Sequence, residues 1–210
     1  MKLSWFMLLQ VFSNAADHKT SYILDNMNYC SQCAATVSHI VPEGDNRPRY
    51  VCTSCESIHY QNPKVVVGCL PFFEDKVLLC KRAIAPRKGY WTLPAGYLEN
   101  GETTSQGALR ETIEEANANA ELLELYTFFS LPHISQIYLF YRARLKDLDF
   151  FPGEETLETQ LFSEQEVPWN ELAFPVINET LKHYFQDLPK NHFPIRSQDI
   201  VIDRKRHPIK

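Results

Sequence analysis

The chain has 210 residues, of which 44% are hydrophobic and 22% are charged, which is typical of one globular domain with room for a small additional module. Its formal net charge of −5 argues against a general nucleic-acid-binding protein, whose binding surface would be basic. Small anionic ligands are not excluded, because a bound metal can supply positive charge locally.

Residues 1–26 form an extension in front of the first cysteine pair. Their apolar run and the letters SNA resemble a secretory signal, but the n-region has one charge, and Trp5 and Gln10 interrupt the run. We therefore expect a disordered or dispensable extension on a cytoplasmic protein, with export as the alternative. No run of 18 or more apolar residues occurs, so we predict no membrane span.

Residues 27–62 contain two C-x-x-C pairs with 18 residues between them, Cys30 with Cys33 and Cys52 with Cys55. Two such turns can each deliver two thiolates to one tetrahedral Zn²⁺, which is the pattern of a zinc ribbon. A disulfide pair or a redox dithiol is the alternative, but no thioredoxin-like βαβ pattern surrounds the cysteines. The ribbon is not basic, so we assign it to packing or to homodimer formation and not to nucleic-acid binding.

Residues 63–187 alternate apolar strand patterns with two helical segments. KVVVGCLPFF predicts a buried strand, and EDK a hairpin turn into VLLCKR; Cys69 and Cys80 in these runs are predicted core residues. ELLELYTFFSL, SQIYLFYRARL and TQLFSEQE predict further strands, and a helix is expected from about Pro175. The pattern predicts an α/β/α sandwich on a mixed sheet, followed by a polar tail over 188–210.

The other predicted helix follows the loop APRKGYWTLPAGYLENGE. Thr103, Thr104 or Ser105 can cap it, and Gln106 lies in capping-box range of Thr103. On a helical wheel three glutamates share an arc of about 100°, and three apolar residues lie opposite and are expected to pack on the sheet. The glutamates are Glu111, Glu114 and Glu115, and the apolar residues are Leu109, Ile113 and Ala116.

The wheel alone leaves two interpretations of the glutamates open, a solvated acidic face or a site for cations. Glu102 can approach the same point from outside the helix, and Arg110 can clamp a carboxylate by charge-assisted hydrogen bonds. Gly96 and Gly101 allow backbone close to a ligand. Clustered carboxylates raise one another's pKa unless cations neutralise them, and Mg²⁺ or Mn²⁺ would suit oxygen ligands.

This stretch resembles the Nudix box, G-x5-E-x7-R-E-U-x-E-E-x-G-U, where U is apolar. Three positions depart from the box, Thr112 and Ala118 at apolar positions and Asn117 at the last glycine. Asn tolerates the left-handed conformation, so we expect Asn117 still to end the helix. The matching residues are Gly96, Glu102, Arg110, Glu111, Glu114 and Glu115.

The resemblance implies a Nudix-type α/β/α fold behind a small zinc ribbon, and hydrolysis of a nucleoside diphosphate linked to another group X. It implies Mg²⁺ or Mn²⁺ ligands at Glu102, Glu111, Glu114 and Glu115, together with a carbonyl of Ala95 or Gly96. The general base is either a box glutamate or a residue of the acidic loop, Glu154, Glu155 or Glu158. As catalytic residues we predict Glu115, Glu114, Arg110 and Glu155.

The identity of X depends on weaker similarity. The S-Q-P-W-P-F-P-x-S signature of NADH pyrophosphatases is absent, and the chain looks more like Nudix proteins assigned to FAD or ADP-ribose. We therefore expect a dinucleotide substrate, with NADH, nucleoside triphosphates or non-catalytic nucleotide sensing as alternatives. The predicted substrate-binding residues are Arg82, Ala95, Gly96, Tyr97 and His133.

Overall fold

The computed structural model describes residues 27–201, and residue contacts divide the chain at the Pro63–Lys64 peptide bond into two compact units. The predicted extension 1–26 lies outside the described residues. Among the described helices none is long and apolar enough to cross a membrane.

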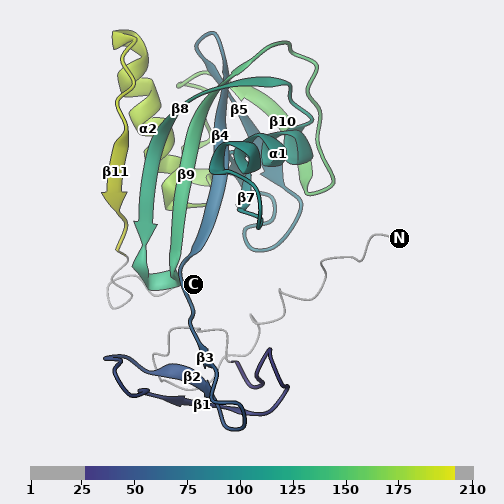
Figure 1. The fold of residues 1–210 in the computed structure, drawn as a ribbon. Coiled ribbons are helices and arrows are strands. Elements are labelled where there is room, and N and C mark those ends of the chain that lie inside the picture. Colours follow the sequence, from purple (N-terminus) through teal and green to yellow (C-terminus); the bar gives the residue numbers. More distant parts are fainter. Residues whose placement is uncertain (1–26, 202–210) are drawn as a thin grey trace. The chain divides into compact units, whose positions relative to one another are not determined.

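The first unit is a small antiparallel sheet of three strands in the order β1-β2-β3 (Figure 1). Its strands are β1 (Val37–Ile40), β2 (Arg49–Cys52) and β3 (Ile58–His59). Each C-x-x-C pair lies at a turn of this unit, where Cys30 and Cys52 are buried and Cys33 and Cys55 are exposed. The short strands thus serve to bring the two turns together.

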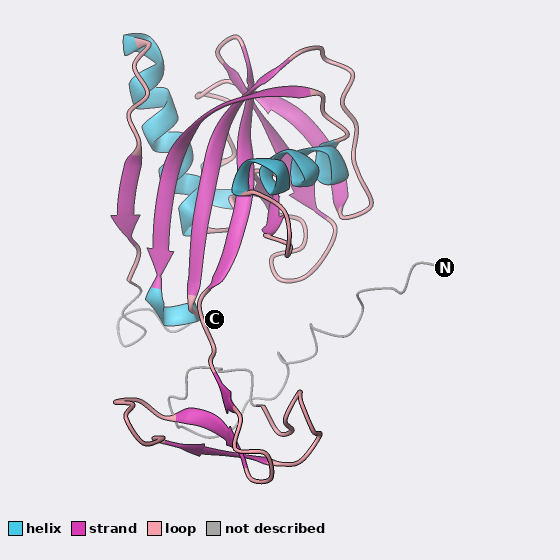
Figure 2. Ribbon diagram, in the orientation of Figure 1, coloured by secondary structure: helices cyan, strands magenta, loops and turns pink. Residues whose placement is uncertain are grey.

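The second unit is built on an eight-stranded mixed sheet, with the central order β10-β5-β4-β9-β8-β11 (Figure 2). The pairs β4–β9 and β8–β11 are parallel and the other pairs are antiparallel. Two short strands, β6 and β7, pair with β5 and β4. The bounds are β4 (Lys64–Phe73), β5 (Lys76–Arg82), β6 (Trp91–Thr92), β7 (Ala95–Tyr97), β8 (Ala120–Leu131), β9 (Gln136–Leu145), β10 (Thr156–Phe162) and β11 (Arg196–Asp199).

One helix packs on each face of this sheet, which confirms the predicted α/β/α arrangement. Alternate residues of β9 show the two faces, since Leu139 and Tyr141 pack beside α1 (Thr104–Ala116), whereas Phe140 packs beside α2 (Pro175–Asp187). The predicted start of α2 is also confirmed. Three short 3₁₀ turns complete the unit: η1 (Pro132–Ile134), η2 (Trp169–Glu171) and η3 (Leu188–Lys190).

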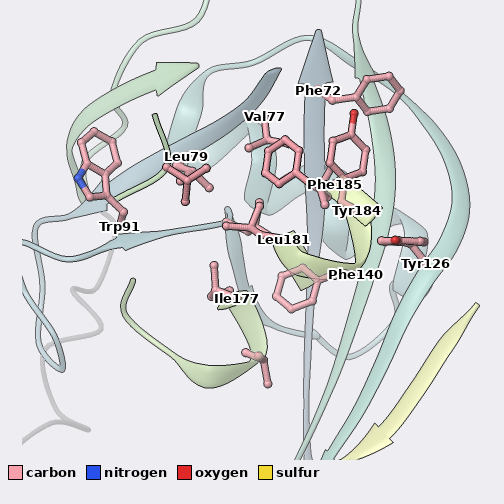
Figure 3. Packing of buried hydrophobic residues seen from close by; sticks show 14 of the residues in the cluster. Phe72, Val77, Leu79, Trp91, Tyr126, Phe140, Ile177, Leu181, Tyr184 and Phe185 are labelled. Atoms are coloured by element: carbon pink, nitrogen blue, oxygen red, sulfur yellow. The ribbon is translucent and has the colours of Figure 1, made fainter. Parts of the chain in front are cut away.

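The main core lies between the sheet and α2 (Figure 3). Tyr184 and Phe185 of α2 lie with their rings 5.4 Å apart, and Tyr184 also packs near Phe72 of β4. The side between the sheet and α1 is lined by smaller residues, among them Ala108 and Cys69. Because these residues are small, α1 can pack close to the sheet. The glutamates of the Nudix box lie on this helix.

The polar tail predicted over 188–210 contains a strand that the sequence pattern did not reveal. β11 extends the sheet by pairing in parallel with β8. Phe193, just before it, packs on the rings of Tyr126 and Tyr184, and Arg196 pairs with the buried carboxylate of Asp187. The strand is set by these tertiary contacts, since its own sequence, RSQD, has no strand-like alternation.

We expect Asp187→Asn to lower the free energy of unfolding at pH 7 by about 3 kcal/mol, because it breaks a charge pair at a side chain that is 1% exposed. Burial opposes the Asp187 charge, but hydrogen bonds from Arg196 and Tyr126 outweigh it and hold the pKa of this carboxyl below its usual value. A lowered folded-state pKa stabilises the protein above pH 3.8, and this contribution is lost as the pH falls through the folded-state pKa.

The measurement is urea unfolding of both proteins between pH 7 and pH 3. The difference between wild type and variant should shrink below pH 4, and Asp199→Asn, on the exposed face of β11, should change stability little. A difference that did not change with pH would contradict the assignment of the Asp187 charge.

Candidate active site

Helix α1 begins and ends as the sequence predicts. The Gln106 amide donates to the Thr103 hydroxyl at 3.2 Å, and the Thr103 amide donates to the Gln106 side chain at 2.8 Å, which confirms the capping box. At the other end Asn117 is left-handed, with φ 47° and ψ 29°, which confirms that Asn can replace the last glycine of the box. Both helix ends are therefore fixed locally.

The buried face of α1 differs from the predicted one. Glu111 and Glu115 are 9% and 8% exposed, whereas Ile113 is 56% exposed, so the expectation was wrong for these three residues. It is confirmed for Glu114, which is exposed, and for Leu109 and Ala116, which pack towards the sheet. The residues that pack on the sheet beside the two glutamates are small: Gly107, Ala108, Thr112 and Ala116. The helix therefore packs closely on the sheet through small side chains. Two of its carboxylates are buried, and its isoleucine is exposed to solvent.

Arg110 organises the carboxylates around it. Its Nε and Nη2 donate to both oxygens of Glu102, at 3.0 and 2.8 Å, as a bidentate pair. Its Nη1 donates to Glu111 at 2.6 Å and to Glu114 at 3.0 Å, and Nη2 also reaches the carbonyl of Tyr97 at 3.1 Å. One guanidinium thus joins the helix, the preceding loop and β7.

The chain segment at Ala95 and Gly96 lies directly against the two buried glutamates. The Ala95 amide donates to Glu115 Oε2 at 3.3 Å. A Cβ atom added at Gly96 would lie 2.3 to 2.5 Å from the Glu111 carboxylate, so a side chain there would displace it. The first box glycine is therefore required by close approach and not by its backbone angle.

Burial and mutual repulsion set the electrostatics of this cluster. Burial, followed by the charge of Glu111, raises the pKa of Glu115 to about 8, although Arg82 and the Ala95 amide oppose the rise. Burial also raises the pKa of Glu111, against the influence of Arg110. In contrast, the hydrogen bonds from Arg110 lower the pKa of Glu102 to about 2. Negative charge at Glu111 and Glu115 is thus incompletely compensated by the protein.

The cluster fits a hard divalent cation, because buried carboxylates with raised pKa values are stabilised by a nearby positive charge. Mg²⁺ commonly uses one or two protein carboxylates together with substrate phosphates. Glu111 and Glu115 meet this requirement, with the backbone at Ala95 and Gly96 beside them. Glu102, Glu111 and Glu114 all pair with Arg110, and the assignment of Glu102 and Glu114 as further ligands stays a prediction.

The acidic loop brings one of its glutamates to the cluster. The charge of Glu155 acts on both Glu111 and Glu115, contributing to the raised pKa of each. Glu158 instead pairs with Lys81 at 3.5 Å on the exposed side of β10, and Glu154 and Glu155 are both exposed. This electrostatic influence favours Glu155 among the three candidates for the general base, and the assignment stays a prediction.

Arg82, at the end of β5, is aimed towards the same cluster. Its Nε donates to the Pro86 carbonyl at 2.9 Å, and its guanidinium lies over the ring of Phe174, 5.2 Å from the ring centre. Its charge lowers the pKa of Glu115 and of Tyr138. Phe174 gave no signal in the sequence, because only the fold brings the start of α2 beside β5.

Tyr97 and His133 occupy different surroundings. Tyr97 is 46% exposed, and its hydroxyl accepts a hydrogen bond from Gln136, which in turn accepts one from Tyr138. His133 lies on η1, the turn between β8 and β9. Gln136 thus links the side chains of Tyr97 and Tyr138.

The four cysteines of the ribbon form a second candidate metal site. Within residues 27–201 they are a group whose ligand atoms all lie within 4.8 Å of one another, and none forms a disulfide. Backbone amides of Cys55 and Ser54 donate to Cys52 Sγ, each at 3.4 Å, and lower the pKa of that thiol. Four convergent sulfur ligands with amide donors fit a structural Zn²⁺.

We expect the purified protein to contain one zinc ion per chain by elemental analysis, and Cys55→Ser to lose most of it, because a structural zinc site needs all four thiolates. Ser54→Ala keeps the four thiols and should keep the metal. A zinc-free protein in which the cysteines oxidise reversibly would instead support the redox alternative.

Comparison with known proteins agrees with both sites. Residues 28–61 match the family model for the Nudix N-terminal zinc ribbon, and residues 62–185 match that for the NUDIX domain. A solved NUDIX hydrolase from Nitrosomonas europaea is 58% identical, with a TM-score of 0.82, and the match covers 84% of this chain and 100% of that one.

Curated relatives match over shorter stretches. An ADP-ribose pyrophosphatase from Methanocaldococcus jannaschii is 36% identical over 35% of this chain and 43% of its own length. A protein named NAD-capped RNA hydrolase NudC, from Photobacterium profundum, is 25% identical over 77% of this chain and 60% of its own length. These matches span less than two thirds of each relative. The match to the NUDIX domain over residues 62–185 shows that the chain belongs to the Nudix hydrolase family, with a Nudix-type zinc ribbon in front of its Nudix domain.

Proposed function

We propose that the protein is a Mg²⁺- or Mn²⁺-dependent pyrophosphohydrolase that cleaves a nucleoside diphosphate linked to X, with FAD or ADP-ribose as the substrate. The observation that supports this most strongly is the pair of buried carboxylates, Glu111 and Glu115, held against Gly96 and Ala95. The alternative interpretation, in which the glutamates form a solvated acidic face, does not explain why α1 buries two of them and exposes Ile113.

Each side chain then has a distinct task. Glu111 and Glu115 would hold the cation, and Arg110 positions Glu111 and Glu114 from one guanidinium. Arg82, oriented by Pro86 and Phe174, binds a phosphate of the substrate. When bound, the divalent cation would offset pyrophosphate charge and lower the pKa of a coordinated water.

Glu155 is the general base in this proposal. Its charge acts on both buried glutamates, and the Gly153 amide of the same loop donates to the Glu115 carbonyl at 3.0 Å. In this proposal Glu155 accepts the proton of a water beside the two glutamates. That water adds its oxygen to one phosphorus of the pyrophosphate, the bridging P–O bond breaks, and two phosphate monoesters leave. FAD would yield FMN and AMP, and ADP-ribose would yield AMP and ribose 5-phosphate.

The test is a panel of FAD, ADP-ribose, NADH and nucleoside triphosphates, each with Mg²⁺ or Mn²⁺ and with products identified by mass. We expect AMP release from FAD or ADP-ribose that stops on chelation. If no compound of the panel is hydrolysed, the proposed hydrolytic function is wrong. Binding without turnover would support the nucleotide-sensing alternative.

A second candidate substrate is NAD(H), because the relative named NAD-capped RNA hydrolase aligns with 77% of this chain. The pyrophosphate chemistry would be unchanged, with only X replaced. Faster turnover of NADH than of FAD and ADP-ribose in the panel would favour it.

A further inference from the structure

The C-terminal end of α1 is joined to loop 147–155 by backbone hydrogen bonds. The Phe151 amide donates to the carbonyl of Ala116, and the Gly153 amide donates to that of Glu115, both at 3.0 Å. A Cβ atom added at Gly153 would lie 1.8 Å from the carbonyl oxygen of Glu114, so no side chain fits there. The loop thus satisfies carbonyls that a helix end leaves without partners.

Asn117 adds a side-chain clamp to this junction. Its Nδ2 donates to the carbonyls of Phe151 at 3.2 Å and Pro152 at 3.4 Å. Both partners accept hydrogen bonds only, so the amide nitrogen must be the atom that faces them. The glycine that the Nudix box has at this position could end the helix equally well, but it could make neither bond.

Loop 147–155 also carries Glu155, and the chain is held on both sides of it. The Thr156 amide donates to the Gly153 carbonyl at 3.1 Å, which forms a tight turn, and the Ala83 amide donates to the Glu155 carbonyl at 2.8 Å. Gly153 is fixed to α1 and Ala83 follows the end of β5, so the position of Glu155 depends on both contacts. If the loop detached from α1, one of these two contacts would be lost.

We propose that Asn117 is a positioning residue, whose side-chain amide holds loop 147–155 on the end of α1 and so fixes Glu155 beside Glu111 and Glu115. Asparagine at this position then both ends the helix and holds the loop, whereas the box glycine could only end the helix. This proposal rests on the proposed hydrolysis, in which Glu155 is the general base.

The decisive variant is Asn117→Gly, which keeps the left-handed helix end and removes only the clamp. With FAD or ADP-ribose and Mg²⁺, we expect kcat to fall about tenfold with KM unchanged, because substrate contacts remain while the base is misplaced. Hydrogen exchange at the amides of Phe151 and Gly153 should become faster in the metal-free protein. Asn117→Asp, of equal size but without the donor, should show the same changes.

The matched control is Asn191→Gly, which alters another left-handed asparagine, φ 46°, at the end of η3. It should leave kcat and exchange in loop 147–155 unchanged. In a double-mutant cycle, Asn117→Gly should have no further effect on kcat once Glu155 is Gln.

The outcomes separate the two proposals. An active wild type whose kcat and loop exchange are unaffected by Asn117→Gly overturns the role of Asn117 alone. Full additivity of Asn117→Gly and Glu155→Gln also overturns it. A wild type inactive on the whole panel overturns the proposed hydrolysis and, with it, the positioning role.

Discussion

Glu115→Gln is expected to lower kcat about a thousandfold and to stabilise the metal-free protein at alkaline pH. Activity falls because the amide cannot supply the carboxylate that holds the cation. Stability rises because the wild-type protein must bury a charge at a side chain that is 8% exposed, beside Glu111, where the Ala95 amide donates a hydrogen bond to it.

The stabilisation should depend on pH in a defined direction. The pKa of Glu115 is raised from 4.5 to about 8 in the folded protein, mainly by burial. A carboxyl whose folded-state pKa is raised costs nothing below pH 4.5, and it lowers stability progressively as the pH rises to about 8. Wild type and variant should therefore be alike near pH 4.5, and the variant should be more stable by a few kcal/mol at pH 9.

Thermal unfolding between pH 5 and pH 9, in the presence of a chelator, measures this difference. Glu121→Gln, an exposed carboxylate paired with Arg144 on the sheet, is the control and should alter neither stability nor kcat appreciably. Retention of most activity by Glu115→Gln would contradict its assignment to the cation.

Arg110→Lys is expected to lower activity about a hundredfold and to destabilise the protein by about 2 kcal/mol. Lysine keeps the charge, but it cannot make the bidentate pair with Glu102 and still reach Glu111 and Glu114. Glu102 and Glu111 are then left partly buried with weaker partners, and the positions of Glu111 and of the loop bearing Glu102 loosen.

Steady-state kinetics with varied Mg²⁺ and urea unfolding test this expectation. The metal concentration for half-maximal activity should rise, since the ligand carboxylate Glu111 loses its fixed orientation. Arg144→Lys, at an ion pair of 3.6 Å between exposed side chains, is the matched control and should change stability by less than about 0.5 kcal/mol. Wild-type kinetics in Arg110→Lys would show that the bidentate hydrogen bonds of the guanidinium are not required.

Tertiary packing, and not the hydrophobic pattern, determines which residues of α1 are buried. The wheel assigned all three glutamates to the outer face, because it treats burial as a consequence of apolarity, and this holds only for Glu114. The structure buries Glu111 and Glu115 because the small residues of the same arc are needed at the sheet, and Gly96 leaves room for a carboxylate. A buried carboxylate next to an exposed isoleucine is stronger evidence for a site than the spacing alone.

The sequence by itself determined the features that depend on local physics. The strand at 64–73, the capping box at Thr103, the start of α2 and the left-handed Asn117 all follow from side-chain pattern and backbone preference. The paired cysteines likewise determined the ribbon site, because each C-x-x-C turn fixes two ligands within a few residues.

Only the tertiary structure decided which groups from distant segments meet. It brought Phe174 beneath Arg82 and Glu155 to the buried glutamates, and it placed β11 beside β8. It also joined the Asn117 amide to carbonyls more than 30 residues away, which turned an irregular helix end into a support for the loop. These contacts arise from packing of the whole domain, and no periodicity within a single segment carries them.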